Sequence, residues 1–375
     1  MASAKDVLKQ IKENDVEWVD LRFTDPKGKW QHLTMCAGVL GEDELEDGLM
    51  FDGSSIEGWK AINESDMILR PDLDSVYMDP FSATPMMIIN CDIVEPSTGE
   101  LYARDPRSTA KRAEAYLKAT GIGDTVYVGP EAEFFMFDDV TFYDGYDGSG
   151  FRIDDIELPT NTGRSYETGN LGHRPRAKGG YFPVAPVDSA VDIRGEMVTT
   201  MLEMGLPCDK HHHEVAAAQH ELGLTFGTLV QTADRMQIYK YVVHQVAHAY
   251  GKTATFMPKP IKSDNGSGMH THIRSGRAAS RCSQAMAMQA FRKCACTSSA
   301  ASSSTPKRLT PSPTRPPTAT SAWCRALKPP CCSLIQAATV RLRAAFLTAP
   351  ATRQSALNSV SPMPSPTPIC AIRHC

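Results

Sequence analysis

The sequence lacks any run of about 18 apolar residues, the length that a membrane-spanning helix needs. It also lacks a basic excess, because 39 lysines and arginines stand against 43 aspartates and glutamates, for a net charge of −4. No basic footprint for nucleic acid is therefore present. The opening residues, MASAKDVLKQ, are polar and lack the apolar core of a signal peptide. These absences predict a cytoplasmic protein without membrane or nucleic-acid partners.

The last 102 residues, 274–375, contain no acidic residue at all. They carry 14 of the basic residues, so that residues 1–273 hold 25 basic and all 43 acidic residues, a net charge of −18. The same tail holds 8 of the 11 cysteines, 12 of the 26 prolines and one of the 26 glycines. Because domain surfaces normally carry charges of both signs, we interpret the two parts separately.

Cysteine is scarce in the first 273 residues, where three widely spaced residues form no CxxC pair. They are Cys36, Cys91 and Cys208. This pattern is typical of a reducing compartment. In the tail, Cys294 with Cys296 and the adjacent Cys331 and Cys332 leave a disulfide scaffold open as an alternative.

The first hundred residues have the pattern of one helix followed by strands. The segment 3–13 predicts an amphipathic helix capped by its first serine. Residues 17–24 and 29–35 have strand character and are joined by the turn sequence DPKG, which predicts a hairpin. Another strand is expected over 86–94. Together these elements indicate a compact N-terminal domain of about 100 residues.

A longer strand is expected over 125–137, where the sequence PEAEF places two carboxylates two residues apart. On a strand, Glu131 and Glu133 point to the same face and repel each other. One interpretation is a solvated strand face. The other is a site for a hard cation whose charge removes the repulsion.

A second acidic cluster lies in HHHEVAAAQHE at 211–221, where Glu214 and Glu221 accompany four histidines. A zinc site is one alternative, but three successive strand residues alternate in direction and cannot all bind one ion. A solvated polar strand is another alternative. Oxygen-rich ligation with an occasional imidazole favours Mg²⁺ or Mn²⁺.

After this cluster, residues 233–250 predict a helix that ends at Gly251. Tyr239, Val243, Val246 and Tyr250 form its apolar stripe. The segment 259–272 then forms a glycine-rich loop that ends in alternating histidines. By itself such a loop is equally consistent with phosphate binding and with an ordinary turn.

These motifs together resemble bacterial type I glutamine synthetase over residues 1–273. The matching strings are FDGSSIEGW at 51–59, NESD at 63–66, GPEAEFF at 129–135, GGYFP at 179–183, HHHEV at 211–215, and FMPKP at 256–260 followed by NGSGMH at 265–270. Their number and order make the resemblance specific. The tail as written carries none of these motifs.

The resemblance implies an α+β fold with two domains. Residues 1–105 would form a small β-grasp-like domain, and residues 106–273 part of a larger catalytic domain with a curved antiparallel sheet flanked by helices. The implied reaction joins ammonia to L-glutamate. The γ-phosphoryl group of ATP first moves to the side-chain carboxylate, and ammonia then displaces phosphate from this γ-glutamyl phosphate. Both steps build negative charge, which divalent cations stabilise.

The resemblance also assigns binding roles. One Mg²⁺ or Mn²⁺ ion would be held by Glu133, Glu214 and Glu221, beside glutamate and ammonia. A second ion, which bridges the phosphates, would be held by Glu131 and His270, and the family supplies a further carboxylate from later in the chain. Glutamate-binding positions are Asn265, Gly266 and also Glu133. Nucleotide-binding positions are Asp209, Phe226 and His272. Asp209 replaces the glutamate that is usual in the family.

Ammonium needs a base because NH₄⁺ has no lone pair with which to attack. By resemblance this base is Asp52, helped by Ser55, Tyr181 and Glu214. Asp52 and Trp59 would reach the site of a neighbouring subunit, which implies a ring-shaped homo-oligomer, typically a dodecamer.

The family pattern stops after Ile273, where the written sequence continues with RSGR. When the reading frame is shifted by one base, the codons of the tail can spell SIWKGGQPLFAGDGYAGLSE and then further strings of the family's C-terminal half. We infer an out-of-frame tail over 274–375, caused by the loss of one base. Its composition predicts disorder or aggregation. The tail as written lacks the arginines and the carboxylate that complete the site.

Two alternatives to an active glutamine synthetase follow. The chain as written is a catalytically dead, truncated glutamine synthetase, or the enzyme is a related ATP-dependent ligase that uses another amine. The string DGSSIEGW and Tyr181 favour ammonia over bulkier amines.

Overall fold

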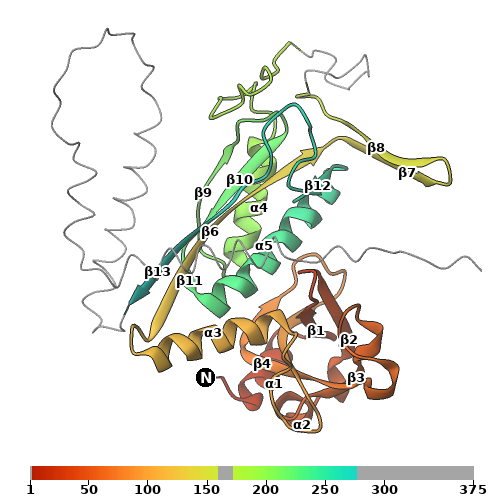
Figure 1. Ribbon diagram of the computed structural model, residues 1–375, viewed down its shortest axis with the longest axis vertical. Coiled ribbons are helices and arrows are strands. Elements are labelled where there is room, and N and C mark those ends of the chain that lie inside the picture. The colour runs from red at the N-terminus through yellow and green to blue at the C-terminus, as the bar shows by residue number, and fades with distance from the viewer. Residues whose placement is uncertain (1, 159–171, 277–375) are drawn as a thin grey trace, which may run out of the picture. The chain divides into compact units, whose positions relative to one another are not determined.

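The computed structural model describes residues 2–158 and 172–276, which form two larger sheets with their covering helices and a separate two-stranded hairpin (Figure 1). The predicted disorder of the tail and its candidate disulfides lie outside these residues. Within the described residues, no helix combines the length and the apolar character that crossing a membrane requires.

The N-terminal sheet has five strands in the order β2-β1-β5-β4-β3. Their bounds are β1 Trp18–Thr24, β2 Trp30–Cys36, β3 Leu49–Asp52, β4 Asp66–Met78 and β5 Met86–Val94. β1 and β5 run parallel, whereas the other pairs are antiparallel. The central strand β5 is buried over eight of its nine residues, because both faces are covered: Ile88 belongs to the core around β6, and Met87 and Ile89 belong to the N-terminal core. The expected strands and the β-grasp-like domain are confirmed.

Two helices, α1 (Ala4–Glu13) and α2 (Glu42–Glu46), belong to this domain. Ser3 and Asp6 form a reciprocal capping box at the start of α1, which satisfies backbone N–H groups that the first turn leaves open. The β1–β2 hairpin turns at Gly28, whose φ of 79° lies in the left-handed region that favours glycine. The predicted helix and hairpin are both present.

Trp59 belongs to the core of this domain, with only 4% of its surface exposed. Its ring lies 5.4 Å from that of Phe23 and 5.5 Å from that of Tyr102. This burial is that of a single subunit, so the expectation that Trp59 reaches a neighbouring subunit stays a prediction. Aromatic packing holds the indole inside its own domain.

The second sheet is organised around the long strand β6, to which β10, β11, β12 and β13 all pair antiparallel. β9 extends it by pairing with β10. The bounds are β6 Thr125–Phe137, β9 Cys208–His213, β10 Gln219–Leu224, β11 Gly227–Thr228, β12 Thr253–Thr255 and β13 Met269–Gly276. A separate hairpin consists of β7 Asp139–Gly145 and β8 Gly148–Asp154. The expected α+β fold with an antiparallel second sheet is confirmed.

Three longer helices accompany this sheet: α3 (Pro106–Thr120), α4 (Val191–Glu203) and α5 (Leu229–Ala249). α4 and α5 pack on it through a core that includes Phe134 and Met197. The predicted start of the last helix at residue 233 is wrong, because Thr228 ends β11 and leads directly into α5. Its stripe is buried except for Tyr250, which is 47% exposed.

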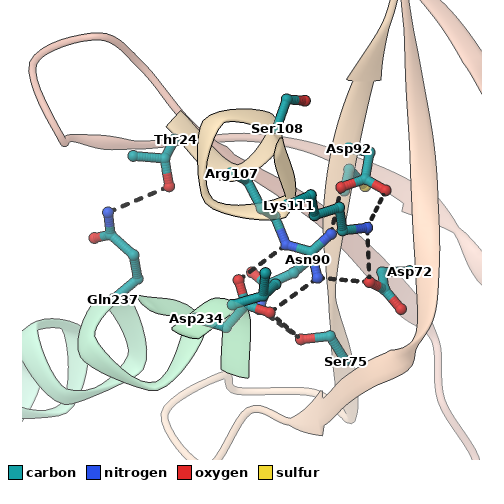
Figure 2. Close-up of polar contacts among 12 residues, drawn as sticks. Thr24, Asp72, Ser75, Asn90, Asp92, Arg107, Ser108, Lys111, Asp234 and Gln237 are labelled. Carbon is teal, nitrogen blue, oxygen red and sulfur yellow. Dashed lines mark hydrogen bonds and ion pairs between the residues drawn. The ribbon is translucent and has the colours of Figure 1, made fainter. Parts of the chain in front are cut away.

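Arg107 of α3 links the N-terminal sheet to α5 (Figure 2). Its guanidinium donates to both carboxylate oxygens of Asp234, at 2.9 Å each. It also contacts Asp92 on β5 at 2.5 Å and Asp72 on β4 at 2.6 Å. Lys111, one turn further along α3, pairs with the same two aspartates. Burial alone would lower the pKa of Arg107. The three neighbouring carboxylates have the larger effect and raise this pKa.

Replacing Arg107 by methionine should destabilise the fold strongly, because it leaves buried carboxylates without their main cation. We expect a loss of about 3–5 kcal/mol in the free energy of unfolding, measured by urea denaturation followed by circular dichroism. The matched control is Lys27→Met, which removes an ion pair with Glu57 whose side chains are 65% and 78% exposed. The control should unfold at the same urea concentration as the parent. Equal stability of the two variants would contradict this role of Arg107.

Candidate functional site

Acidic side chains from β6 meet residues of two neighbouring strands. The antiparallel register places Glu131 opposite His270 of β13 and Glu133 opposite Glu221 of β10. Glu131 and Glu133 are two residues apart on one strand, so they share a face, as their spacing predicted. Like charges directly opposite each other in a sheet are destabilising, so this arrangement calls for a positive partner.

His212, Glu214 and Glu221 form the tightest group, with one ligand atom from each lying within 4.8 Å of the others. His212 Nδ1 is 3.4 Å from Glu214 Oε1, and His212 Nε2 is 3.4 Å from Glu221 Oε1. His212 is absent from the set of ligands expected from the sequence. The signal was available, because His212 and Glu214 are two residues apart at the end of β9 and just beyond it.

The other two histidines of the triplet point away from this group. His213 is buried and contacts Glu157 Oε2 at 2.7 Å and the backbone oxygen of Glu214 at 2.7 Å. The guanidinium of Arg194 lies 3.3 Å from His211 Nδ1. The three successive histidines therefore do not converge on one point, which removes the alternative of a zinc site made by the triplet.

The group has more acidic than basic side chains, and this excess together with burial shifts the pKa values of its members. Burial and the nearby charge of Glu133 raise the pKa of Glu214 to about 7. Burial and repulsion from Glu221 also raise the pKa of Glu133, although the N–H of Gly268 opposes the shift. Burial lowers the pKa of His212, but its contact with Glu221 outweighs burial and raises it. Carboxylates with one imidazole are a donor set that fits Mg²⁺ or Mn²⁺.

The glycine-rich loop lies against the same group. Gly268 N–H donates to Glu133 Oε2 at 2.9 Å, and Glu133 N–H donates to the Gly268 carbonyl at 3.0 Å. Only glycine fits at position 266, because a Cβ there would lie 2.4 Å from the Pro258 carbonyl oxygen. The neighbouring Asn265 donates its backbone N–H to Asp264 Oδ1. The later part of the loop that resembles a glutamate-binding loop thus lies beside Glu133.

Of the residues expected to assist the base, Tyr181 lies near Glu214, whereas Ser55 does not. Its ring stacks on Phe182 at 3.9 Å and lies 6.0 Å from His212. Burial raises the pKa of Tyr181, and the charges of Glu214 and Glu221 add to the shift. A backbone hydrogen bond holds the segment of Tyr181 next to the cluster, because Gly180 N–H donates to the Val215 carbonyl at 2.9 Å.

Asp52 and Ser55 lie elsewhere, at the end of β3 in the N-terminal sheet (Figure 1). Asp52 accepts hydrogen bonds from Ser54 N–H, Ser54 Oγ and Ser55 Oγ. The bonds from Ser54, and then those from Ser55, lower the pKa of Asp52 and keep it ionised. Within the described ranges, no hydrogen bond or ion pair connects Asp52 to Glu214.

The expected nucleotide-binding residues do not all meet. His272 Nε2 lies 3.4 Å from Glu131 Oε2, at the acidic face of β6. The ring of Phe226 packs edge-on against Tyr127 at 5.8 Å. Asp209 is exposed near the start of β9. The structure therefore brings His272 to Glu131, and all three nucleotide-binding roles stay predictions.

Two family models match this chain. The glutamine synthetase β-grasp domain matches residues 15–96, and the glutamine synthetase catalytic domain matches residues 103–276. The glutamine synthetase of Rhizobium meliloti (strain 1021) is 68% identical over 273 residues, which cover 73% of this chain and 58% of that protein. The chain thus spans a little over half the length of this relative.

Solved structures agree. Plasmodium falciparum glutamine synthetase, determined by cryo-EM, has a TM-score of 0.69 and 28% identity, covering 74% of this chain and 55% of that one. A complex of GmaS with ADP has a TM-score of 0.59 and 25% identity, covering 73% and 56%.

Cation binding should tighten as the pH rises through about 7, because a cation at pH 6 has to displace the proton of Glu214. One proton with this pKa predicts about tenfold tighter Mn²⁺ binding at pH 8 than at pH 6. Isothermal titration calorimetry in two buffers of different ionisation enthalpy would measure the affinity and the proton release. The variant Glu214→Gln is the control, and its weaker binding should lose most of this pH dependence. Equal affinity of the parent at both pH values would contradict the prediction.

The raised pKa of Glu214 also makes the stability of the cation-free chain depend on pH. The pKa of folded Glu214 lies above its ordinary value of 4.5, so the folded state binds this proton more tightly than the unfolded state. The resulting stabilisation is present at low pH and is lost as the pH rises from about 4.5 to about 7. Between pH 5 and pH 8, the free energy of unfolding measured by urea denaturation should fall less for Glu214→Gln than for the parent. An equal loss would contradict it.

Proposed function

The chain belongs to the glutamine synthetase family, and we propose that it serves the ATP-dependent ligation of ammonia to L-glutamate, which produces L-glutamine. The carboxylate-rich group on β6, β9 and β10 is the observation that carries this proposal. Its surplus of acid suits a reaction in which cations stabilise phosphoryl transfer.

The first step transfers the γ-phosphoryl group of ATP to the side-chain carboxylate of glutamate. The O–P bond to ADP breaks as a new O–P bond forms, which yields γ-glutamyl phosphate and ADP. Bound divalent cations would neutralise charge on the phosphates during this transfer. We assign Glu133, Glu214 and Glu221, with His212 beside them, to one cation, and Glu131 with His270 to the other. The ADP in the GmaS complex supports a nucleotide site in this fold.

The remaining residues bind the substrates. Asn265 and Gly266 would bind glutamate, a role supported by the contact between their loop and Glu133. Asp209, Phe226 and His272 would contact the nucleotide.

In the second step ammonia attacks the acyl phosphate and releases inorganic phosphate. Asp52 would take the proton from ammonium, assisted by Ser55, Tyr181 and Glu214. The hydrogen bonds from Ser54 and Ser55 keep Asp52 ionised, so that its negative charge can attract ammonium, but they lower its pKa and do not strengthen it as a base. Because Asp52 belongs to the N-terminal sheet, we propose that it serves the acidic cluster of a neighbouring subunit in a homo-oligomer, a dodecamer in the intact protein. We further propose a cytoplasmic location.

A second candidate is a chain without catalysis. The family match ends at residue 276, and the acid-free residues 274–375 supply no carboxylate to complete the second cation site. A frame slip after Ile273 accounts for both observations. The chain as written would then keep the carboxylate-rich group without the groups that grip glutamate and the phosphates.

One experiment separates these functions. The chain as written and a chain with one base inserted after the Ile273 codon are given L-glutamate, ATP, Mg²⁺ and ammonium, and glutamine and phosphate are measured. We expect glutamine from the frame-restored chain only, and its loss in the restored chain carrying Glu214→Gln. Glutamine from the chain as written would overturn the second candidate. A restored chain that uses methylamine but not ammonium would overturn the proposed substrate.

A further inference from the structure

Gln219, the first residue of β10, has every polar group of its side-chain amide engaged. Its Nε2 donates to Glu133 Oε2 at 2.6 Å and to the Gly266 carbonyl oxygen at 2.9 Å. Its Oε1 accepts the N–H of Ala216 at 3.0 Å. The side chain is 1% exposed, so these contacts hold the amide in one orientation.

The contact with Gln219 determines how Glu133 is oriented. Oε2 of Glu133 accepts both the Gln219 amide and the backbone N–H of Gly268. A Cβ at Gly268 would lie 2.7 Å from Glu133 Oε1 and 3.3 Å from His270 Nε2, so Oε1 and His270 border the same space. One carboxylate oxygen, Oε2, is thus committed to neutral donors, and the other, Oε1, lies on the side of His270.

The donor to Glu133 at position 219 is a neutral amide, and its lack of charge affects how Glu133 can bind a metal ion. A lysine or arginine at position 219 would bring a positive charge that competes with a metal ion for Glu133. An amide orients the carboxylate and leaves its negative charge uncompensated.

We propose that Gln219 is a positioning residue that turns Glu133 Oε1 toward a bound cation and couples this carboxylate to the Gly266 loop. The inference rests on the proposed function, in which Glu133, Glu214 and Glu221 hold a divalent cation and the Gly266 loop binds glutamate. Gln219 itself touches neither the metal nor the substrate. It acts through Glu133 on one side and through the carbonyl of Gly266 on the other.

The test replaces Gln219 by methionine, which keeps the length and apolar volume of the side chain and removes its hydrogen bonds. Mn²⁺ binding to the full 375-residue chain is measured by the electron paramagnetic resonance signal of free Mn²⁺. We expect about 10- to 100-fold weaker binding. The matched control is Gln237→Met on α5, which removes a comparable amide bridge to Thr24 Oγ1 and the Gly28 carbonyl. The control should bind Mn²⁺ like the parent.

Hydrogen exchange at the Gly268 amide supplies a second readout. In the parent chain, Mn²⁺ should slow this exchange, because the ion fixes Glu133 and thereby its bond to Gly268 N–H. In Gln219→Met the slowing should be lost. A purely structural role would lower the melting temperature and leave both the Mn²⁺ affinity and the slowing intact. If the methionine variant does not fold, Gln219→Asn, whose amide is too short to reach Glu133, undergoes the same two measurements.

The outcomes separate the two proposals. If the parent chain binds no Mn²⁺, the cation site of the proposed function fails and this inference fails with it. If the parent binds Mn²⁺ and a folded Gln219 variant binds it equally well, only the role of Gln219 is overturned.

Discussion

Antiparallel pairing along β6 is the constraint on which the candidate site depends. Four strands pair with β6, and two of them bring His270 opposite Glu131 and Glu221 opposite Glu133. A shift of one residue in either register would turn these side chains to the other face of the sheet. The fold therefore places carboxylates against one another at a cost that a bound cation would offset, and this conflict with simple stability is typical of a functional site.

A comparison of the two acidic clusters in the described residues supports this interpretation. The aspartates around α3 are neutralised by the chain itself, because Arg107 and Lys111 contact them directly. In the cluster on β6, β9 and β10, an imidazole is the basic group in close contact, and the pKa of Glu214 is raised to about 7. The first cluster is a closed structural network, whereas the second leaves negative charge for a partner from solution.

Local patterns in the sequence predicted much of this structure. The capped helix α1, the β1–β2 hairpin and the shared face of Glu131 and Glu133 all follow from residues close together in the chain. The burial of Trp59 was not predictable in this way, because an aromatic residue suits a core as well as a subunit contact. His212 was not among the expected ligands although its spacing from Glu214 is visible in the sequence, because the family resemblance assigns this cation to carboxylates alone.

Other features depend on residues far apart in sequence. Gln219 meets Glu133 only through the pairing of β10 with β6, and Arg107 meets Asp234 only when α5 packs beside α3. Neither contact leaves a periodic or local signal in the sequence. Substrate contacts that the family places after residue 276 lie outside the matched region.

The central claim is that the acidic cluster of this chain binds a divalent cation. A crystal structure of the full chain grown with Mn²⁺, with diffraction data collected at the manganese absorption edge, tests this claim most directly. We expect an anomalous peak about 2.0–2.3 Å from carboxylate oxygens of Glu133, Glu214 and Glu221. An ordered cluster without such a peak, or manganese bound only at other residues, would contradict it.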